Sequence, residues 1–366
     1  MASQQRRILN LFALHRIIIP VIIGLAVIVF MIFNDIRGHE LGFMRIGLQS
    51  IAFFIVAILL VAVRDLAYIY RIRLLTGNEL SWKKSFQVIF LWEFASSVTP
   101  SVVGGSAIAV FILIKEKLGA GKSTAIVMVT ALLDEMFYII MVPVVFLFAG
   151  IEKLSVVGST FTFLGVVFGP MGIFLVGYLF ISILTILLSY GLFINPSAVK
   201  WLLVKITSIT FFKRFRKGAT ETGDQIILSS QELKGKSLVF WLKAFGATFL
   251  SWTARFWVVN CLIMGFTGLI SFPENLLIYA RQLMMWVIML VSPTPGGSGI
   301  AEYFFPVFLR EFIAGQAGDL TTIVAFAWRF LTYYPYLIVG ALILPFWLRR
   351  VYLGRRLIRF RNDKKK

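Results

Sequence analysis

Charged side chains occur inside long apolar runs of this 366-residue sequence, where few charges are expected. A charge near the centre of a bilayer costs at least ~2.5–3.5 kcal/mol, so such groups should face a polar interior and form pairs. Three of them are arginines, and a guanidinium can hold a phosphate through two parallel hydrogen bonds. Lys243 lies close enough to the end of its run for its ammonium to reach the interface. The eight ionisable residues in apolar runs are Glu93, Asp134, Glu135, Lys243, Arg255, Arg281, Glu302 and Arg329.

Two similar motifs rich in proline and glycine interrupt apolar runs. The first reads Thr99-Pro100, three further residues, then Gly104-Gly105-Ser106-Ala107-Ile108-Ala109, and the second reads Thr294-Pro295-Gly296-Gly297-Ser298-Gly299-Ile300-Ala301. Proline disfavours helix at the residue before it, and paired glycines let the chain turn and let backbones approach closely. We expect Ser106 and Ser298 to be the N-caps of half-helices whose free amides would suit an anion such as a lipid phosphate. The alternative is a pair of ordinary kinks between closely packed helices.

The composition indicates a membrane protein. Apolar residues make up 59% of the chain and charged residues 14%, against ~45–50% and ~25% in soluble proteins. These values exclude a disordered protein and argue against an ordinary cytosolic enzyme. Runs of 17 or more uncharged residues are long enough to cross ~30 Å of hydrocarbon. The candidate segments are 17–33, 46–63, 85–114, 123–149, 155–194, 237–265, 275–309 and 320–348.

The distribution of charge gives an orientation to these segments. We interpret the two interrupted segments, 85–114 and 275–309, as re-entrant hairpins, which leaves six full spans and places both termini on one side. The net charge is +19, and 28 of the 36 Lys and Arg residues then fall on the side of the termini. Basic loops favour the cytoplasm, so the pattern predicts a multi-pass protein of the cell (inner or plasma) membrane with both termini cytoplasmic, and it does not indicate nucleic-acid binding.

The predicted fold is therefore an all-α polytopic membrane protein: about six full transmembrane helices plus two re-entrant helical hairpins in an inverted-repeat arrangement. Residues 1–366 form a single domain, with repeat cores at 85–149 and 275–348. The run 155–194 could be one span or two turning near Gly169-Pro170, and the charge rule favours one. Segment 195–236, which contains an amphipathic stretch, and the polybasic tail 349–366 are expected to lie on anionic lipid or simply to orient the chain.

The motifs resemble those of a known family. Thr99-Pro100 with Gly104-Gly105, the stretch Leu132–Glu135, and the stretch Pro293–Glu302 are similar to the membrane region of lysylphosphatidylglycerol synthase and to stand-alone flippase-like domain proteins. The resemblance implies two re-entrant elements and the movement of a charged lipid between leaflets. Family members often carry Glu after the first glycine pair, where this chain has Ser106. No segment outside the spans matches the soluble aminoacyl-transferring domain, so synthesis of an aminoacyl lipid is not expected.

The preferred hypothesis is a lipid transporter, flippase- or scramblase-like, that passes a charged headgroup through a polar cavity near the midplane. Its partners would be membrane phospholipids or a lipid-linked phosphate, with a second copy of the chain possible, and no catalytic residue, cofactor or metal is expected. Neighbouring carboxylates on a helix point about 100° apart, so only one of Asp134 and Glu135 should face the cavity. The expected translocation residues are Glu93, Thr99, Pro100, Gly104, Gly105, Ser106, Asp134, Glu135, Arg255, Arg281, Thr294, Pro295, Gly296, Gly297, Ser298, Glu302 and Arg329.

Two other functions stay open at this point: a membrane-embedded transferase that uses a polyprenyl-phosphate-linked donor, and a non-catalytic partner of such an enzyme. A transferase usually needs a cluster of metal-binding carboxylates in a loop, and the outer loops hold no such pair. The stretch 119–124 resembles a phosphate-binding loop, but Glu116 stands where that motif needs glycine. His15 and His39 are far apart and Cys261 is the only cysteine, so neither a zinc site nor a disulfide is expected.

Overall fold

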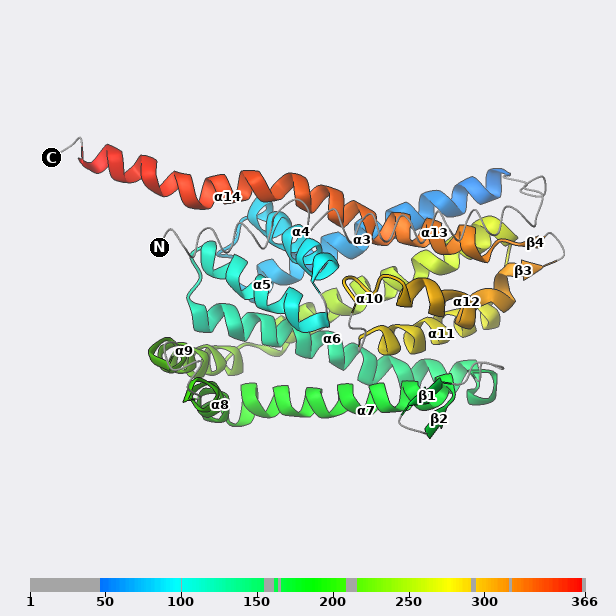
Figure 1. Cartoon of the computed structure of the whole chain (residues 1–366), viewed down its shortest axis with the longest axis horizontal. Helices are drawn as coiled ribbons and strands as arrows, with labels where there is room; N and C mark the ends of the chain where they lie inside the picture. The colour runs from blue at the N-terminus through cyan, green and yellow to red at the C-terminus, as the bar shows by residue number, and fades with distance from the viewer. Residues whose placement is uncertain are drawn as a thin grey trace.

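The computed structural model describes residues 47–99, 101–154, 161–163, 166–208, 216–290, 294–315 and 318–363. The predicted span 17–33, Pro100 and the last three residues of the basic tail lie outside the described residues. Nearly all described residues are helical, and the helices form one elongated bundle (Figure 1). The all-α architecture of a polytopic membrane protein is confirmed.

The first half of the bundle contains α3 (Leu48–Leu75), α4 (Trp82–Val98), α5 (Ser101–Lys115) and α6 (Ala120–Ala149), followed by a short 3-10 helix, η2 (Ile151–Leu154). A small antiparallel hairpin, β1 (Phe161–Phe163) and β2 (Val166–Phe168), pairs Thr162 with Val167. It leads into α7 (Pro170–Ser189), a π-helical turn η3 (Tyr190–Ile194), α8 (Pro196–Ser208) and α9 (Arg216–Lys234).

The second half contains α10 (Leu238–Thr267), α11 (Phe272–Leu290) and α12 (Ile300–Ile313). A second antiparallel hairpin, β3 (Ala314–Gly315) and β4 (Gly318–Asp319), pairs Ala314 with Asp319. The last elements are α13 (Thr321–Thr332) and α14 (Tyr334–Asp363).

Five helical stretches of the described residues are long and apolar enough to cross a membrane. They match five of the six predicted full spans, and their outward faces carry exposed leucine, isoleucine and phenylalanine, as lipid contact requires. The five are Leu48–Leu75, Ala120–Ala149, Pro170–Ile194, Leu238–Thr267 and Thr321–Tyr352. In the described part of the run 155–194 there is thus one long helix, which begins at Pro170, where the alternative placed a turn between two spans.

The boundary predicted for the segment 46–63 is wrong. Helix α3 continues to Leu75, so Arg64 and Arg71 lie within it and are buried, not in a cytoplasmic loop. Their guanidinium groups find carboxylate partners on other helices, and this compensation lets the helix continue past the end of its apolar run.

Both interrupted segments form pairs of short helices. Helices α4 and α5 have 17 and 15 residues, about 25 and 22 Å at 1.5 Å per residue. Helices α11 and α12 have 19 and 14 residues. Figure 1 shows the turn of each pair near the middle of the bundle, with α4 and α5 on one side and α11 and α12 on the other. The two pairs are called the first and second hairpin below. The opposite orientation fits an inverted repeat, and entry from opposite membrane faces stays a prediction.

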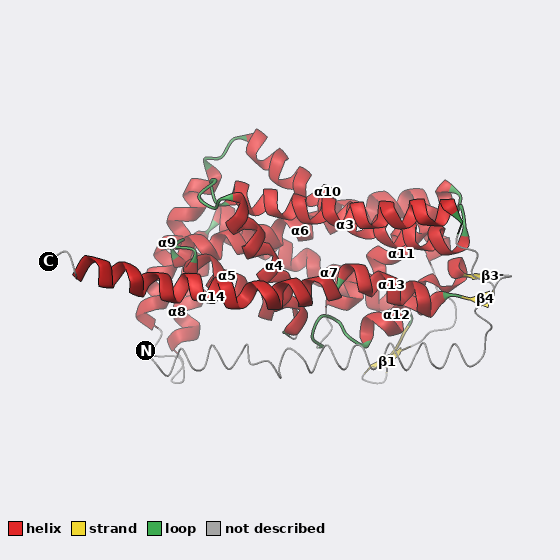
Figure 2. Ribbon diagram, turned by 90° about the horizontal axis from the view of Figure 1, so that it is seen from above, coloured by secondary structure: helices red, strands yellow, loops and turns green. Residues whose placement is uncertain are grey.

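Two ends of the bundle can be defined by its connections. The basic end carries the loops after α3 and α5, the helices α8 and α9, and the far end of α14. The opposite end carries the turn from α10 to α11 and the β3–β4 hairpin (Figures 1 and 2). At the basic end Gln225 Oε1 of α9 accepts a hydrogen bond from Gly121 N at 2.8 Å. This contact occupies an amide of the stretch that resembles a phosphate-binding loop.

Glycines hold the first hairpin closed. Gly104 and Gly105 lie in the first two turns of α5 and face α4. A Cβ built on Gly105 would lie 3.0 Å from the Cα of Ser96, and one on Gly104 would lie 2.8 Å from the Cβ of Thr99. Gly105 therefore lets the two backbones approach closely, as expected, whereas the glycine pair lies inside α5 and does not turn the chain.

We expect Gly105→Ala to lower the free energy of unfolding by about 1–3 kcal/mol, because the methyl group must push α4 and α5 apart. Gly246 in α10 is the matched control, since a Cβ there meets no atom within 4 Å. Gly246→Ala should raise the stability by about 0.5–1 kcal/mol through helix propensity. Thermal unfolding of the detergent-solubilised protein measures both, and shifts in the same direction would contradict the proposed helix contact.

The hydrophobic interior is divided into two cores. One lies toward the opposite end and contains the second half of α6, much of α10, and α11, α12 and α13. The other lies toward the basic end and contains the second half of α3, α4, α5, the first half of α6 and α14. In α6 the change from one core to the other falls between Leu133 and Phe137. This division locates a level halfway along the bundle at which the packing changes.

Candidate functional site

Charged residues lie at the level where the two hydrophobic cores meet. Asp134 is placed between them on α6, Arg64 lies between them on α3, and Arg329 lies between them at the α13–α14 junction. Asp134 is the fifteenth of the 30 residues of α6, which puts it near the middle of a span. The charged layer described below therefore lies far from either end of the long helices.

The first part of the layer joins α3, α4 and α14. Arg64 Nη2 donates to Glu93 Oε1 at 2.6 Å, and Arg64 Nη1 lies 3.0 Å from Asp65 Oδ1. The hydroxyl of Tyr336 donates to the same oxygen of Asp65 at 2.8 Å. The Arg64 side chain is 1% exposed, so its guanidinium is balanced by these two acids and by the rings of Tyr68 and Tyr336.

The second part joins α3, α6 and α10. Arg71 holds Asp134 in a bidentate pair with Nη–Oδ distances of 2.5 and 3.2 Å. The indole of Trp252 donates to Asp134 Oδ1 at 2.8 Å, and Arg71 also donates to Thr248 Oγ1 at 2.9 Å. Glu135 points elsewhere and accepts a hydrogen bond from Thr185 of α7 at 3.2 Å. The two neighbouring carboxylates thus face different helices.

The third part is Arg255 of α10. Its guanidinium lies against two indoles that also contact each other, 4.8 Å from the ring centroid of Trp252 and 4.7 Å from that of Trp286. Its nearest acid is Glu93, with an Nη2–Oε2 distance of 3.8 Å. Arg255 is therefore held mainly by aromatic rings, and Glu93 belongs first to Arg64.

The second hairpin carries its own buried ion pair. Glu302 lies in the first turn of α12, where its carboxylate accepts hydrogen bonds from Gly299 N at 2.6 Å and from Arg329 Nε at 2.7 Å. Arg329 also donates from Nη2 to the carbonyl of Gly296 at 3.2 Å. The Glu302 and Arg329 side chains are 5% and 6% exposed. The pair fixes the turn of the hairpin to α13.

Tyr333 links the two hairpins. Its hydroxyl donates to the carbonyl of Ser97, near the end of α4, at 3.2 Å and lies 3.4 Å from Ser298 Oγ. The Arg329 guanidinium lies 4.1 Å from the centre of its ring. Gly296 has a φ of +57°, and a Cβ on it would lie 3.0 Å from the Cζ of this tyrosine. The turns of both hairpins therefore meet at one aromatic side chain.

Several predicted residues have a different place or role. Ser106 is not an N-cap, because α5 begins at Ser101 and Ser106 lies inside it. Ser298 is not an N-cap either, because Gly299 occupies that position before α12. In the first hairpin α5 already begins at Ser101, whereas three glycines with positive φ, at 296, 297 and 299, extend the turn in the second hairpin.

Thr99, Thr294 and Pro295 shape the two breaks. Thr99 ends α4 in an extended conformation (φ −105°, ψ 143°), and its hydroxyl donates to the carbonyl of Ala95. Thr294 and Pro295 open the second turn, with Gly297 N donating to the Thr294 carbonyl at 3.1 Å. These residues set backbone geometry.

Arg281 is not part of the central layer. Its guanidinium lies 2.9 Å from Glu311 and donates to the carbonyls of Phe308 and Lys153. Phe308 and Glu311 lie in the second half of α12, and Lys153 lies just after α6, at the opposite end of the bundle. Arg281 therefore ties the second hairpin to that end. Lys243 is exposed near the basic end of α10, as its position in the sequence predicted.

Sequence reasoning missed residues that complete the layer: Arg64, Asp65, Tyr68, Arg71, Trp252, Tyr333 and Tyr336. Arg64, Tyr68 and Arg71 follow one another at helical spacing of four and three, a signal that would have placed them on one face of an extended α3. The partners of the tyrosines come from helices far apart in the chain, and no local pattern marks them.

The charges of the central layer are balanced. Arg64, Arg71 and Arg255 face Asp65, Glu93 and Asp134, and Arg329 faces Glu302. In a layer with no net charge, a group that carries one positive and one negative charge can pair with a carboxylate and an arginine at the same time. No charge is then left unpaired in a medium of low dielectric constant. Among the described residues no group of three or more His, Cys, Asp or Glu is placed to hold a metal ion.

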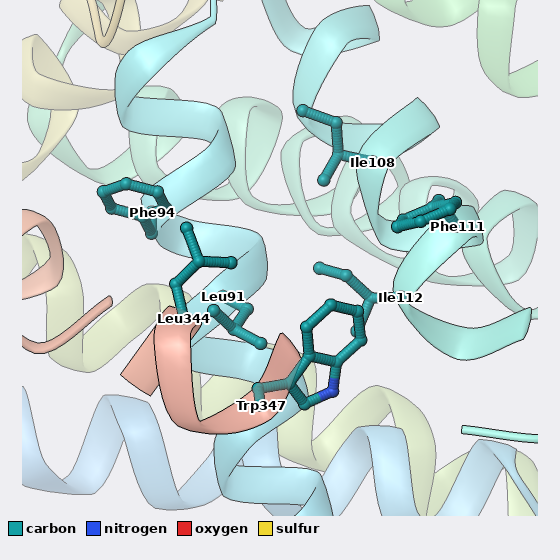
Figure 3. Close-up of a pocket in the computed structure, with 7 residues that line it drawn as sticks. All are labelled: Leu91, Phe94, Ile108, Phe111, Ile112, Leu344 and Trp347. Carbon is teal, nitrogen blue, oxygen red and sulfur yellow. The ribbon is translucent and has the colours of Figure 1, made fainter. Parts of the chain in front are cut away.

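A small apolar pocket opens beside the first hairpin. Its volume is about 10 Å³, and it lies between α4, α5 and α14 (Figure 3). Such a space has room for about one water molecule, and its wall is too apolar to bind one well. Its side chains are Leu91, Phe94, Ile108, Phe111, Ile112, Leu344 and Trp347. The pocket marks the seam between α14 and the first hairpin.

Comparison with known proteins places this geometry in context. The family described as the lysylphosphatidylglycerol synthase TM region matches residues 17–340. A protein named UPF0104 membrane protein, from Archaeoglobus fulgidus, is 26% identical over 309 residues, which cover 79% of this chain and 84% of the archaeal protein. No solved structure matches. The matched region includes both hairpins and every residue of the central layer, and it ends at Gly340.

Proposed function

This chain belongs to the lysylphosphatidylglycerol synthase TM region family, and we propose that it moves a charged phospholipid or a lipid-linked phosphate between the leaflets of its membrane. The observation that carries the proposal is the meeting of two oppositely directed hairpins at Tyr333, beside a balanced layer of buried ion pairs. Broken helices that meet near the midplane are the usual frame of a transport site.

The ion pairs supply the path for the headgroup. A phosphate that enters the layer can replace a carboxylate opposite an arginine, and a headgroup cation can replace that arginine opposite the carboxylate. When both exchanges occur together, as with a zwitterionic headgroup, no buried charge is left unpaired, which lowers the barrier that a bare charge would meet. The lipid chains would stay in the bilayer while the headgroup passes between the hairpins.

Rocking of one hairpin against the other would open the layer to each side in turn. Tyr333 is the contact that such a motion must break, because it joins Ser97 of the first hairpin to Ser298 of the second. The protein acts in this proposal as a carrier and makes no covalent change in the lipid.

Reconstitution into liposomes tests the function. Vesicles of phosphatidylglycerol and phosphatidylethanolamine that carry a trace of fluorescent phospholipid should exchange it between leaflets faster with the protein than without it. Glu302→Gln should slow the exchange, whereas Lys243→Ala, on an exposed side chain, should not. Exchange equal to that of empty vesicles, across several headgroups, would overturn the proposal.

We also propose that the basic end faces the cytoplasm, as the distribution of Lys and Arg indicates. Cys261 is buried and is the only cysteine, so Cys261→Ser gives a clean background. A cysteine introduced by Lys236→Cys should react with an impermeant maleimide only after cells are opened. Labelling in intact cells would reverse the orientation.

A further inference from the structure

Arg255 is the most weakly paired arginine of the central layer. Among the described residues its one acidic partner within 4.0 Å is Glu93, at 3.8 Å, a distance beyond a direct hydrogen bond. The side chain is 14% exposed, and its guanidinium lies over the faces of the adjoining indoles of Trp252 and Trp286. The indole rings hold the guanidinium in place. Its five N–H groups can each donate a hydrogen bond, and Glu93 is too far away to accept one.

Two further donors near Arg255 also lack acceptors. The indole Nε1 of Trp286 and the hydroxyl of Tyr138 are buried, and neither has a hydrogen-bond partner in the described part of the chain. Trp286 packs against Trp252 at a centroid distance of 5.6 Å, and Tyr138 packs edge-on against Trp252 at 5.1 Å. A buried donor left without a partner costs about 1–3 kcal/mol, so this cluster is expected to serve a ligand.

The surrounding carboxylates do not satisfy this cluster. Asp134 is taken by Arg71 and by Trp252, and Glu93 lies 2.6 Å from Arg64. Arg255 could therefore leave Glu93 for another anion while Glu93 keeps a close cation. The arrangement offers a positive charge and two neutral donors to which the part of the chain that the structure describes supplies no acceptor.

We propose that Arg255, Trp286 and Tyr138 form the site that binds the phosphate group of the transported lipid. Phosphate oxygens accept the parallel hydrogen bonds that a guanidinium donates, and the indole and phenol donate to the remaining lone pairs. The choice of a lipid as the source of the phosphate rests on the proposed function, whereas the phosphate chemistry rests on the donors alone.

Binding in detergent tests the site. The readout is the rise in unfolding temperature on adding a short-chain phosphatidylglycerol, compared with inorganic phosphate and with a short-chain diacylglycerol that has no phosphate. The wild-type protein should be stabilised by the phospholipid and not by the diacylglycerol. Equal stabilisation by inorganic phosphate would assign the site to a free anion and overturn the lipid part, and equal stabilisation by diacylglycerol would overturn the phosphate part.

Tyr138→Phe separates binding from folding. Removal of a buried hydroxyl without a partner should leave the unliganded protein as stable as before or more stable, yet the affinity for the phospholipid should fall about tenfold, since a hydrogen bond to a charged group is lost. Arg255→Lys keeps the charge and should weaken binding by a similar factor, because it loses the bidentate geometry. Tyr70→Phe, at an exposed tyrosine of α3, is the control and should bind as the wild type does.

The liposome assay distinguishes this inference from the proposed function. If the wild-type protein exchanges lipid and both variants bind and exchange it as well as the wild type, the phosphate site is wrong and the function stands. If the wild-type protein exchanges no lipid while its phospholipid binding depends on Tyr138 and Arg255, the site stands and the transport function is wrong.

Discussion

Arg329→Ala is expected to lower the free energy of unfolding by about 3–5 kcal/mol, because the variant leaves the Glu302 carboxylate buried without its cation. Glu302 would keep the hydrogen bond from Gly299 N, but a single amide does not balance a full charge. The carbonyl of Gly296 would also lose its donor. The turn of the second hairpin should loosen, and Tyr333 should lose the cation that lies on its ring.

The control for this variant is another arginine of the same region. Arg310 pairs with Asp319 at 2.7 Å, but its side chain is 66% exposed. Arg310→Ala should therefore cost no more than about 1 kcal/mol, because surface ion pairs contribute little. Thermal unfolding in one detergent measures both variants side by side. An equal loss of stability in the two would show that burial does not make the Glu302–Arg329 pair more stabilising than a surface ion pair.

A double variant shows whether the loss comes from the orphaned charge. Glu302→Gln together with Arg329→Met removes both charges, so its stability should lie closer to that of the wild type than Arg329→Ala does. Lipid exchange should stay low in the double variant, since the charges are gone from the path. Recovery of stability without recovery of exchange would separate the structural role of the pair from its role in transport.

The hairpins could be predicted from sequence because their causes are local. A proline follows Thr99 in the sequence and disfavours helix at that residue, where α4 ends, and glycines with positive φ turn the chain at 296, 297 and 299. The N-cap predictions failed for a related reason. The three residues between Pro100 and Gly104 form the first turn of α5, so the same residue types that build a turn in the second hairpin lie inside a helix in the first.

The pairing of the buried charges could not be predicted in the same way. The separation in sequence is 29 residues for Arg64 and Glu93, 63 for Arg71 and Asp134, and 271 for Tyr336 and Asp65. The cost of burial predicts that a partner exists, but only the packing of helices decides which one. The extension of α3 was missed because a hydropathy window ends at its first charge, although the partners of that charge lie elsewhere.

Asp134→Ala should cause the other large loss of stability, also about 3–5 kcal/mol. Its carboxylate accepts three hydrogen bonds, two from Arg71 and one from Trp252. The Arg71 side chain is 4% exposed, and in the variant its remaining polar partner among these groups is Thr248. A nearly dry guanidinium and a buried indole N–H would both lose their acceptor.

The neighbouring residue provides the control. Glu135 accepts one hydrogen bond, from Thr185, whose hydroxyl also lies 2.8 Å from the carbonyl of Ile181. Glu135→Ala should therefore leave no orphaned donor and cost less than about 1 kcal/mol. A larger loss for Glu135→Ala than for Asp134→Ala would contradict the assignment of Asp134 to the central layer.

Asp134→Asn divides the loss between charge and hydrogen bonding. The amide oxygen can still accept from Trp252 or from Arg71, but it cannot balance the guanidinium, so the stability should lie between those of the wild type and Asp134→Ala. Because Arg255 stacks on the same indole that Asp134 orients, the asparagine variant should also keep more phospholipid binding than the alanine variant. Thermal unfolding ranks the wild type and the two variants by stability, and the detergent binding assay ranks them by affinity for the phospholipid. The proposed link between the Asp134 pair and the phosphate site requires the same ranking in both measurements.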